Sequence, residues 1–243
     1  MTSHWAESAL TWWEEAGVDT IVGEEPHDWL AGPKQGAAPP PDLPPPPPAQ
    51  TFPDDLAAFQ AWLATTEAIP FAGPGARRLA PTGSATSGLM AITDVPSPDD
   101  VAAGSLFSGE QGALLDNMLR NFSEKLLGGA PVNRDTLYLA PFSPIRPPAG
   151  RIDPDGVRFL AEAMRHHIGL VAPKAVLIFG DSCARALLGI PMTQARGEWH
   201  GLAISTGLVP AIVTIRPQEL MTQPKLRTHA WADLQLLAEK LKA

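Results

Sequence analysis

The chain has 243 residues, of which 44% are hydrophobic and 18% charged, a composition typical of a soluble globular protein with one sizeable α/β core. No uninterrupted run of about 18 apolar residues is present, so we expect no membrane span, and the acidic first residues lack the features of a secretory or transit peptide. The single Cys183 cannot form an intrachain disulfide, which favours a reducing, cytoplasmic setting.

Charge is distributed unevenly along the chain. The formal net charge is −8, but residues 1–67 contain one basic and 11 acidic residues, whereas residues 68–243 contain 17 basic and 15 acidic ones. The N-terminal part is therefore a polyanion and the remainder is nearly neutral. A neutral body can carry local basic patches, so charge permits DNA contact by the body without indicating it.

Residues 1–32 form the first predicted segment, an acidic stretch with a short amphipathic helix over residues 3–16. A helix of this length is marginal alone in water, so we expect it to bury its tryptophans in a groove of a protein partner. The residues predicted to make this contact are Trp5, Trp12, Trp13, Val18 and Ile21.

Residues 33–52 form a predicted linker. Eight of the ten residues from Pro39 to Pro48 are proline, which predicts a stiff polyproline II spacer. A polyproline ligand for a partner protein is the alternative.

Residues 53–243 form the main predicted domain, in which a helix over Asp54–Thr66 is followed by alternating strands and helices. The strands are short and apolar, and are predicted at Gly88–Thr93, Thr136–Ala140, Ala175–Phe179 and Ala211–Ile215. The following helices are predicted at Gln111–Phe122, Pro154–Val171, Ser182–Leu188 and Thr228–Leu241. This alternation predicts a three-layer α/β/α sandwich with a mostly parallel, four-stranded central sheet.

In such sheets a site forms beyond the carboxyl ends of the strands. We therefore expect four loops to converge there, at Thr93–Gly109, Pro141–Arg151, Gly180–Cys183 and Arg216–Leu220.

Five segments together resemble the uracil-DNA glycosylase superfamily, and its family 4 in particular. In chain order they are Leu89–Leu119, Thr136–Pro148, Val171–Gly189, Arg196–His200 and Ile215–Trp231. Each match is short, but their order and spacing follow the family layout over nearly the whole chain. The N-terminal segment and the proline linker are also similar to the extension of alphaproteobacterial members.

The resemblance implies an active site whose residues have largely been replaced. Excision requires the nucleotide to be flipped into a pocket where charge develops on the sugar and the departing base. Asp94 stands where the family has a glutamate, and Phe107 where it has the aromatic residue that stacks on uracil. Pro141 stands at the uracil-reading asparagine and Arg216 at the histidine of the His-Pro motif. Proline offers no side-chain hydrogen bond, so uracil recognition is expected to be weak.

Three of these positions also have a purely structural interpretation. Asp94 suits a Thr-Asp-x-Pro turn, Phe107 suits a core position, and Arg216 suits an ion pair or a phosphate contact.

Many family 4 enzymes hold an iron–sulfur cluster on four cysteines. Here Ile145 stands at one of the matching positions and the chain has a single cysteine, so we expect no cluster and no other cofactor. The adjacent His166 and His167 lack partners at metal-ligand spacing, so we expect no metal site.

Three functions remain open. The first is a catalytically impaired interaction module in DNA replication or repair. A short similarity around Trp13 to the tethered peptide of the clamp-loader psi subunit of bacterial DNA polymerase III makes a replication accessory role one form of it. The second is an active glycosylase acting on uracil or other deaminated bases with divergent specificity. The third is a DNA-binding protein that does not cut, with phosphate contacts from Arg146, Arg196, Lys225 and Arg227.

Overall fold

The computed structural model describes residues 51–242. These residues belong to the compact unit Gln50–Ala243. The predicted helix over residues 3–16, its partner-binding tryptophans and nearly all of the predicted linker lie outside the described residues, so those expectations stay predictions.

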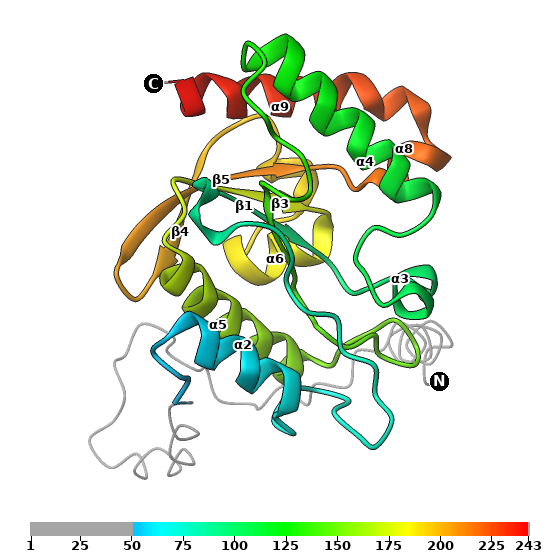
Figure 1. Ribbon diagram of the computed structural model, residues 1–243, viewed down its shortest axis with the longest axis vertical. Helices are drawn as coiled ribbons and strands as arrows, with labels where there is room; N and C mark the ends of the chain where they lie inside the picture. Colours follow the sequence, from blue (N-terminus) through cyan, green and yellow to red (C-terminus); the bar gives the residue numbers. More distant parts are fainter. Residues whose placement is uncertain (1–50, 243) are drawn as a thin grey trace, which may run out of the picture. The chain divides into compact units, whose positions relative to one another are not determined.

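A mixed sheet forms the centre of the unit (Figure 1). Its strands are β1 (Leu89–Thr93), β2 (Tyr138–Pro141), β3 (Ala175–Phe179), β4 (His200–Ile204) and β5 (Gly207–Thr214). They are arranged in the order β2-β1-β3-β5-β4, and every neighbouring pair is parallel except β4 with β5. All residues of β1, β2 and β3 are buried, as expected for parallel strands covered on both faces.

Helices and helical turns alternate with the strands. They are α2 (Leu56–Thr65), η1 (Ala85–Ser87), α3 (Pro98–Ala103), α4 (Glu110–Asn121), the π-helical turn η2 (Phe122–Leu126), α5 (Pro154–Val171), α6 (Asp181–Leu188), α7 (Met192–Ala195), α8 (Pro217–Thr222), η3 (Pro224–Leu226) and α9 (Arg227–Lys242). None of the helices in the described part of the chain has the length and apolar character that crossing a membrane requires.

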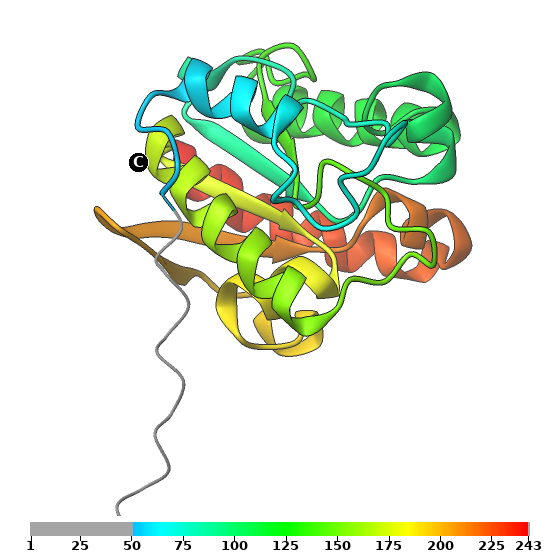
Figure 2. The same cartoon turned by 90° about the horizontal axis from the view of Figure 1, so that it is seen from below.

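Side-chain alternation along the strands divides the core into two layers. Met90 and Ile92 of β1 point into a cluster formed with α5 and α6, whereas Leu89 and Ala91 point into a cluster formed with α4 and α9. Figures 1 and 2 show α4 and α9 on one side of the sheet and α2 and α5 on the other. The predicted α/β sandwich is therefore confirmed.

Two helices illustrate how the sequence sets local structure. Asp153 caps α5 by accepting from the Gly156 N–H, and Pro154 occupies the first turn, where its missing N–H costs nothing. Ser97 and Asp100 form a reciprocal capping box at the start of α3. This short helix lies inside the segment Thr93–Gly109, which was predicted to be a loop throughout.

The prediction of a four-stranded sheet was one strand short. The additional strand is β4, which pairs with β5 in antiparallel fashion at the sheet edge. Only Leu202 of β4 is buried, so the strand lacks the apolar run that marks the other strands. The strand β5 also begins four residues earlier than predicted and includes Pro210, which pairs opposite Gly201. Pro210 lies just before the part of β5 that pairs with β3, so at this position β5 has a partner only on its β4 side. A proline is tolerated at such an edge position because it has no N–H to donate.

Candidate active site

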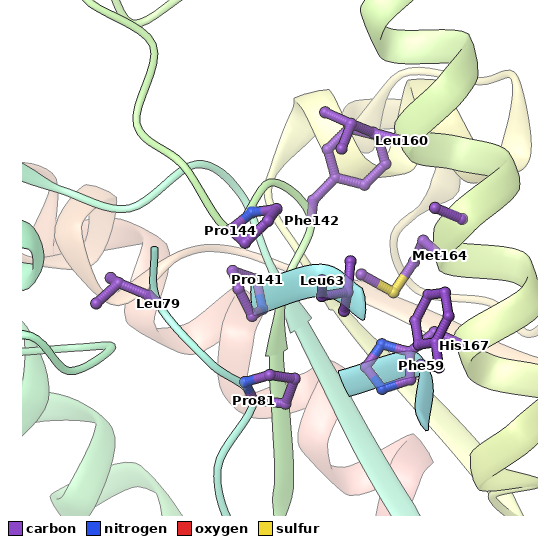
Figure 3. A pocket seen from close by; sticks show the side chains of 11 residues that line it. Phe59, Leu63, Leu79, Pro81, Pro141, Phe142, Pro144, Leu160, Met164 and His167 are labelled. Atoms are coloured by element: carbon purple, nitrogen blue, oxygen red, sulfur yellow. The ribbon is translucent and has the colours of Figure 1, made fainter. Parts of the chain in front are cut away.

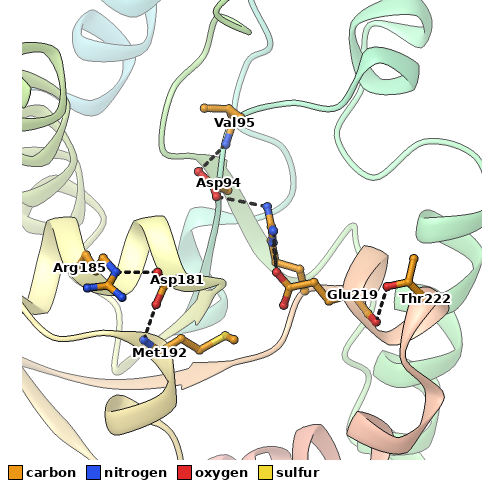
Figure 4. Close-up of polar contacts among 8 residues, drawn as sticks. Asp94, Val95, Asp181, Arg185, Met192, Glu219 and Thr222 are labelled. Carbon is orange, nitrogen blue, oxygen red and sulfur yellow. Dashed lines mark hydrogen bonds and ion pairs between the residues drawn. The ribbon is translucent and has the colours of Figure 1, made fainter. Parts of the chain in front are cut away.

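Asp94 and Arg216 meet at the carboxyl edge of the sheet. Asp94 directly follows β1, and Arg216 lies two residues beyond β5 as the N-cap of α8. Because both strands run parallel to β3, their carboxyl ends share one edge. Arg216 Nη1 donates to Asp94 Oδ2 at 3.2 Å, while Asp94 Oδ1 accepts the Val95 N–H at 2.9 Å (Figure 4).

A second carboxylate holds the same guanidinium. Glu219 Oε1 accepts from Arg216 Nε at 3.0 Å and from Nη2 at 2.6 Å. Burial acts to lower the pKa of Arg216, but the Glu219 hydrogen bonds and the charges of Glu219 and Asp94 outweigh it, so this pKa is raised. Asp94 is only 7% exposed, so its negative charge faces a fixed cation instead of water.

Gly180, directly after β3, makes room for this arrangement. A Cβ at this position would lie 2.7 Å from Arg216 Cδ, so any other residue would displace the arginine side chain. The aliphatic part of the Arg216 side chain therefore packs against Gly180 at the end of β3, and its guanidinium contacts Asp94.

Phe107 joins Asp94 and Arg216 around one cavity. The cavity has a volume of about 20 Å³, enough for about one water molecule. Its remaining lining residues, from the end of β1 and from the loops and helix starts nearby, are Thr93, Val95, Ser97, Asp100, Gln111 and Gln218. The structure therefore brings three predicted site residues together, but leaves no space for a base between them.

The backbone of Phe107 is held in an unusual conformation. Its φ is +51°, which is costly for a bulky side chain and persists only where neighbours impose it. Arg134 Nη1 donates to the Phe107 carbonyl at 3.0 Å, and a Cβ on Gly112 would lie 1.9 Å from that carbonyl oxygen. Asp100 accepts the N–H of the next residue, Ser108, at 2.7 Å.

The Phe107 ring is 4% exposed and packs edge-to-face on Phe179, with ring centroids 5.7 Å apart. The ring is thus a core contact in this structure, and its role as a stacking platform for a base stays a prediction.

Two side-chain amides lie beside Phe107, from Gln111 and Gln218. The Gln111 amide nitrogen is already used, because it donates to Ser97 Oγ at 2.9 Å and to Asp100 Oδ1 at 3.0 Å. Gln218 follows the proline of the Arg-Pro motif. No imidazole from the described residues lines this cavity.

Pro141 lies elsewhere. It is the last residue of β2, opposite Thr93 of β1, and it lines a separate apolar cavity of about 20 Å³ with Phe59, Leu63 and Phe142 (Figure 3). The two predicted base-binding positions, Phe107 and Pro141, therefore do not share a cavity among the described residues.

Asp94 also borders a larger cavity on its other side. This cavity has a volume of about 240 Å³ and is lined by Phe142, Arg151, Ile152 and Ser182 among others. It combines an aromatic ring, an exposed cation and the Asp94 carboxylate at the carboxyl edge of the sheet.

The four predicted DNA-contact cations have different surroundings. Arg146 Nη1 donates to the Pro96 carbonyl at 2.7 Å and ties two site loops together. Arg196 forms a two-pronged ion pair with Asp233, at 2.8 and 3.1 Å. Lys225 and Arg227 are exposed in η3 and at the start of α9. Their contact with phosphates stays a prediction, and two of the four already have protein partners.

The lone Cys183 lies in α6 and is fully buried. Burial raises the pKa of its thiol well above the usual value, with the charge of Asp94 adding to the shift and that of Arg216 opposing it. Because the thiolate is the reactive form, this shift favours the less reactive neutral thiol at neutral pH.

Sequence reasoning missed three residues of this site. Glu219 carries a signal, since a carboxylate three residues after Arg216 in a helix start can reach back to it. Gln218 sits beside the recognised Arg-Pro pair. Gly180 carries no local signal, because its role depends on a side chain 36 residues away in the sequence.

Comparison with known families supports the α/β fold described above. The family model described as the uracil DNA glycosylase superfamily matches residues 80–235, which include every strand and the paired Asp94 and Arg216. A search of curated proteins found no match. Since the family match covers well over half of the chain, the protein belongs to the uracil DNA glycosylase superfamily.

Proposed function

We propose that this chain is a family 4-like member of the superfamily that does not carry out normal uracil excision, and that it serves as an interaction module in DNA replication or repair. In this role the acidic N-terminal segment with Trp5, Trp12 and Trp13 recruits a protein partner. An accessory subunit similar to clamp-loader psi is one form of this role.

The observation that carries the proposal is the closed Asp94–Arg216 pair. A glycosylase carboxylate acts by stabilising positive charge that develops on the sugar. Here the Asp94 carboxylate is paired with a guanidinium at 3.2 Å, and the cavity that it shares with Phe107 has a volume of only about 20 Å³. Opening this cavity for a base would break a part-buried ion pair, which costs free energy because the buried Asp94 carboxylate would lose its cation.

A second candidate function is a glycosylase with divergent base specificity. The cavity of about 240 Å³ beside Asp94 and Phe142 favours it, because a flipped base needs both space and a ring to stack on. In this case Asp94 would act from its other side, while Arg216 would stabilise negative charge on the leaving base.

One assay separates the two. The full chain is incubated with single-stranded and duplex oligonucleotides containing uracil, hypoxanthine or xanthine, and abasic sites are detected by alkaline strand cleavage. We expect no abasic product above the buffer control. Product that disappears in Asp94→Ala but persists in Asp99→Ala would establish the second candidate instead. Asp99 is a suitable control because it is an exposed carboxylate nearby in the chain, in the first turn of α3.

The recruiting role has its own test. Partners captured by the full chain are compared with those captured by a chain lacking residues 1–32. We expect the specific partners to be lost, and an unchanged set would contradict the role of this segment.

A further inference from the structure

A second hollow lies away from the carboxyl edge of the sheet, between α4 and α9. It has a volume of about 280 Å³, and its apolar lining includes Leu114 and Met118 of α4, Leu220 of α8, and Trp231 and Leu234 of α9. We call it the α4–α9 groove. Figure 1 shows both helices on the same face of the sheet. An engineered cavity of about 150 Å³ holds a benzene ring, so the groove has room for a large apolar side chain.

The polar part of the groove is cationic. Lys125 of η2 and Arg227 at the start of α9 both line it, both are exposed, and neither forms an ion pair with any residue between 51 and 242. The other polar lining residues are Asn117 and Asn121. No carboxylate in the described range lines the groove.

Two carboxylates of the helices that form the groove are held by other partners. Asp116 of α4 pairs with Arg134 at 2.6 Å, and Asp233 of α9 is buried against Arg196. Glu124, next to Lys125 in the chain, is exposed but does not line the groove, so Lys125 and Arg227 can attract a negatively charged ligand that approaches from solvent.

We propose that the α4–α9 groove binds an acidic peptide segment of a partner protein, which inserts one aromatic or large aliphatic side chain between α4 and α9. The apolar lining binds the inserted side chain, and Lys125 and Arg227 bind carboxylates of the peptide on either side of it. The charges also favour fast, oriented encounter. This surface is separate from the Asp94–Arg216 pair, and its use does not depend on whether excision is retained.

Charge and lining favour a peptide over a nucleic acid. Strand binding relies on a cationic track that follows successive phosphates, with aromatic rings between them. The groove offers two cations and a mainly aliphatic lining around one tryptophan, Trp231. Such a surface suits a helix or turn with a single anchor.

The test is fluorescence anisotropy on the full chain with a labelled synthetic peptide that has glutamates on both sides of a Trp-Leu pair. We expect saturable binding that weakens with added salt, because the carboxylate contacts are exposed and screened. Replacing the peptide's Trp and Leu by Ala, or its Glu by Gln, should each weaken binding about tenfold or more, as expected where anchor and charge both contribute.

Two protein variants locate the site. The double variant Lys125→Glu/Arg227→Glu should weaken peptide binding at least about tenfold, because two favourable charge contacts become repulsive. The matched control is Lys240→Glu/Lys242→Glu, the same charge change in the last turn of α9, and it should bind the peptide like the wild type. Both variants alter exposed side chains, and a circular dichroism spectrum like that of the wild type verifies the fold.

Three results would overturn the proposal. The first is equal binding of the peptide by Lys125→Glu/Arg227→Glu and by Lys240→Glu/Lys242→Glu. The second is displacement of the peptide by a single-stranded oligonucleotide that binds more tightly and loses affinity in Lys125→Glu/Arg227→Glu, which would make the groove a nucleic-acid site. The third is a dimer in sedimentation analysis that Lys125→Glu/Arg227→Glu dissociates, which would make the groove an interface between copies.

Discussion

The buried His167 of α5 makes stability depend on pH in a calculable way. Its Nε2 lies 2.8 Å from the Tyr138 hydroxyl, which also accepts a hydrogen bond from the Gln60 side chain at 2.8 Å. Gln60 donates to the phenol oxygen, so the phenol proton is available to be donated to Nε2 of the neutral imidazole. Protonation of His167 would remove this acceptor and place a positive charge in a site that is 1% exposed.

The magnitude follows from the pKa. Burial, with a smaller contribution from the neighbouring His166, lowers the pKa of His167 from 6.5 to about 4. The unfolded chain therefore binds a proton more readily than the folded chain between these values, so stability is fully present above pH ~6.5 and is lost as pH falls toward ~4. Between pH ~7.5 and ~4.5, linkage gives a loss of about 2–3 kcal/mol from this group alone.

The assay is urea unfolding followed by circular dichroism at both pH values. Carboxylates also titrate in this range, so the informative quantity is the difference between the wild type and His167→Gln. On acidification, the stability of His167→Gln should fall by about 2–3 kcal/mol less than that of the wild type. His229→Gln, in an exposed part of α9, is the control and should follow the wild type. The reasoning fails if the wild type and His167→Gln lose the same stability on acidification.

Two further predictions concern buried contacts. Arg196→Met leaves the buried Asp233 carboxylate without its cation and should cost about 3–5 kcal/mol of unfolding free energy in urea, whereas Arg196→Met combined with Asp233→Leu should recover more than half of that loss. Gly112→Ala places a Cβ 1.9 Å from the Phe107 carbonyl oxygen and should cost at least about 2 kcal/mol by the same measurement, since the contacted atom is backbone and cannot rotate away. Gly169→Ala, within α5 and with only Ser205 Oγ at 3.8 Å, should instead stabilise by about 0.5–1 kcal/mol. Equal losses in the two glycine variants would contradict the steric argument.

Most of the fold could be predicted because its signals are local. The apolar runs of β1 and β3 are buried on both faces, and the amphipathic stripe of α5 faces the core, so period and burial agree. The edge strand β4 escaped prediction because an edge strand buries little, and Leu202 is its only buried residue. The other strands could be predicted because their buried residues form apolar runs in the sequence, and not because of strand propensity.

The site was harder to predict than the fold. The family layout brought Asp94, Phe107 and Arg216 to attention as separate positions, and the structure brings these three around one cavity. The family layout did not indicate that Pro141 lines a different cavity. An alignment gives the position of a residue in the chain and not the direction of its side chain. The distance between Asp94 and Arg216 likewise depends on two strands that are separated by about half the chain.

The ion pair at the carboxyl edge depends on more than Asp94 and Arg216, because Glu219 and Gly180 also fit the arginine side chain. An imidazole at position 216 would be shorter and would carry no obligatory charge, so it would need neither a second carboxylate nor extra space. A guanidinium needs both, and the structure supplies both: Glu219 at 2.6 Å from Nη2 and a missing Cβ at Gly180, where any side chain would lie 2.7 Å from Arg216 Cδ. Asp94 shares this one fixed cation with Glu219, which makes the shorter contacts, so the Asp94 carboxylate is held in place on the side that faces Arg216. A substrate that uses Asp94 must therefore either displace Arg216 against Glu219, or approach from the cavity on the Phe142 side.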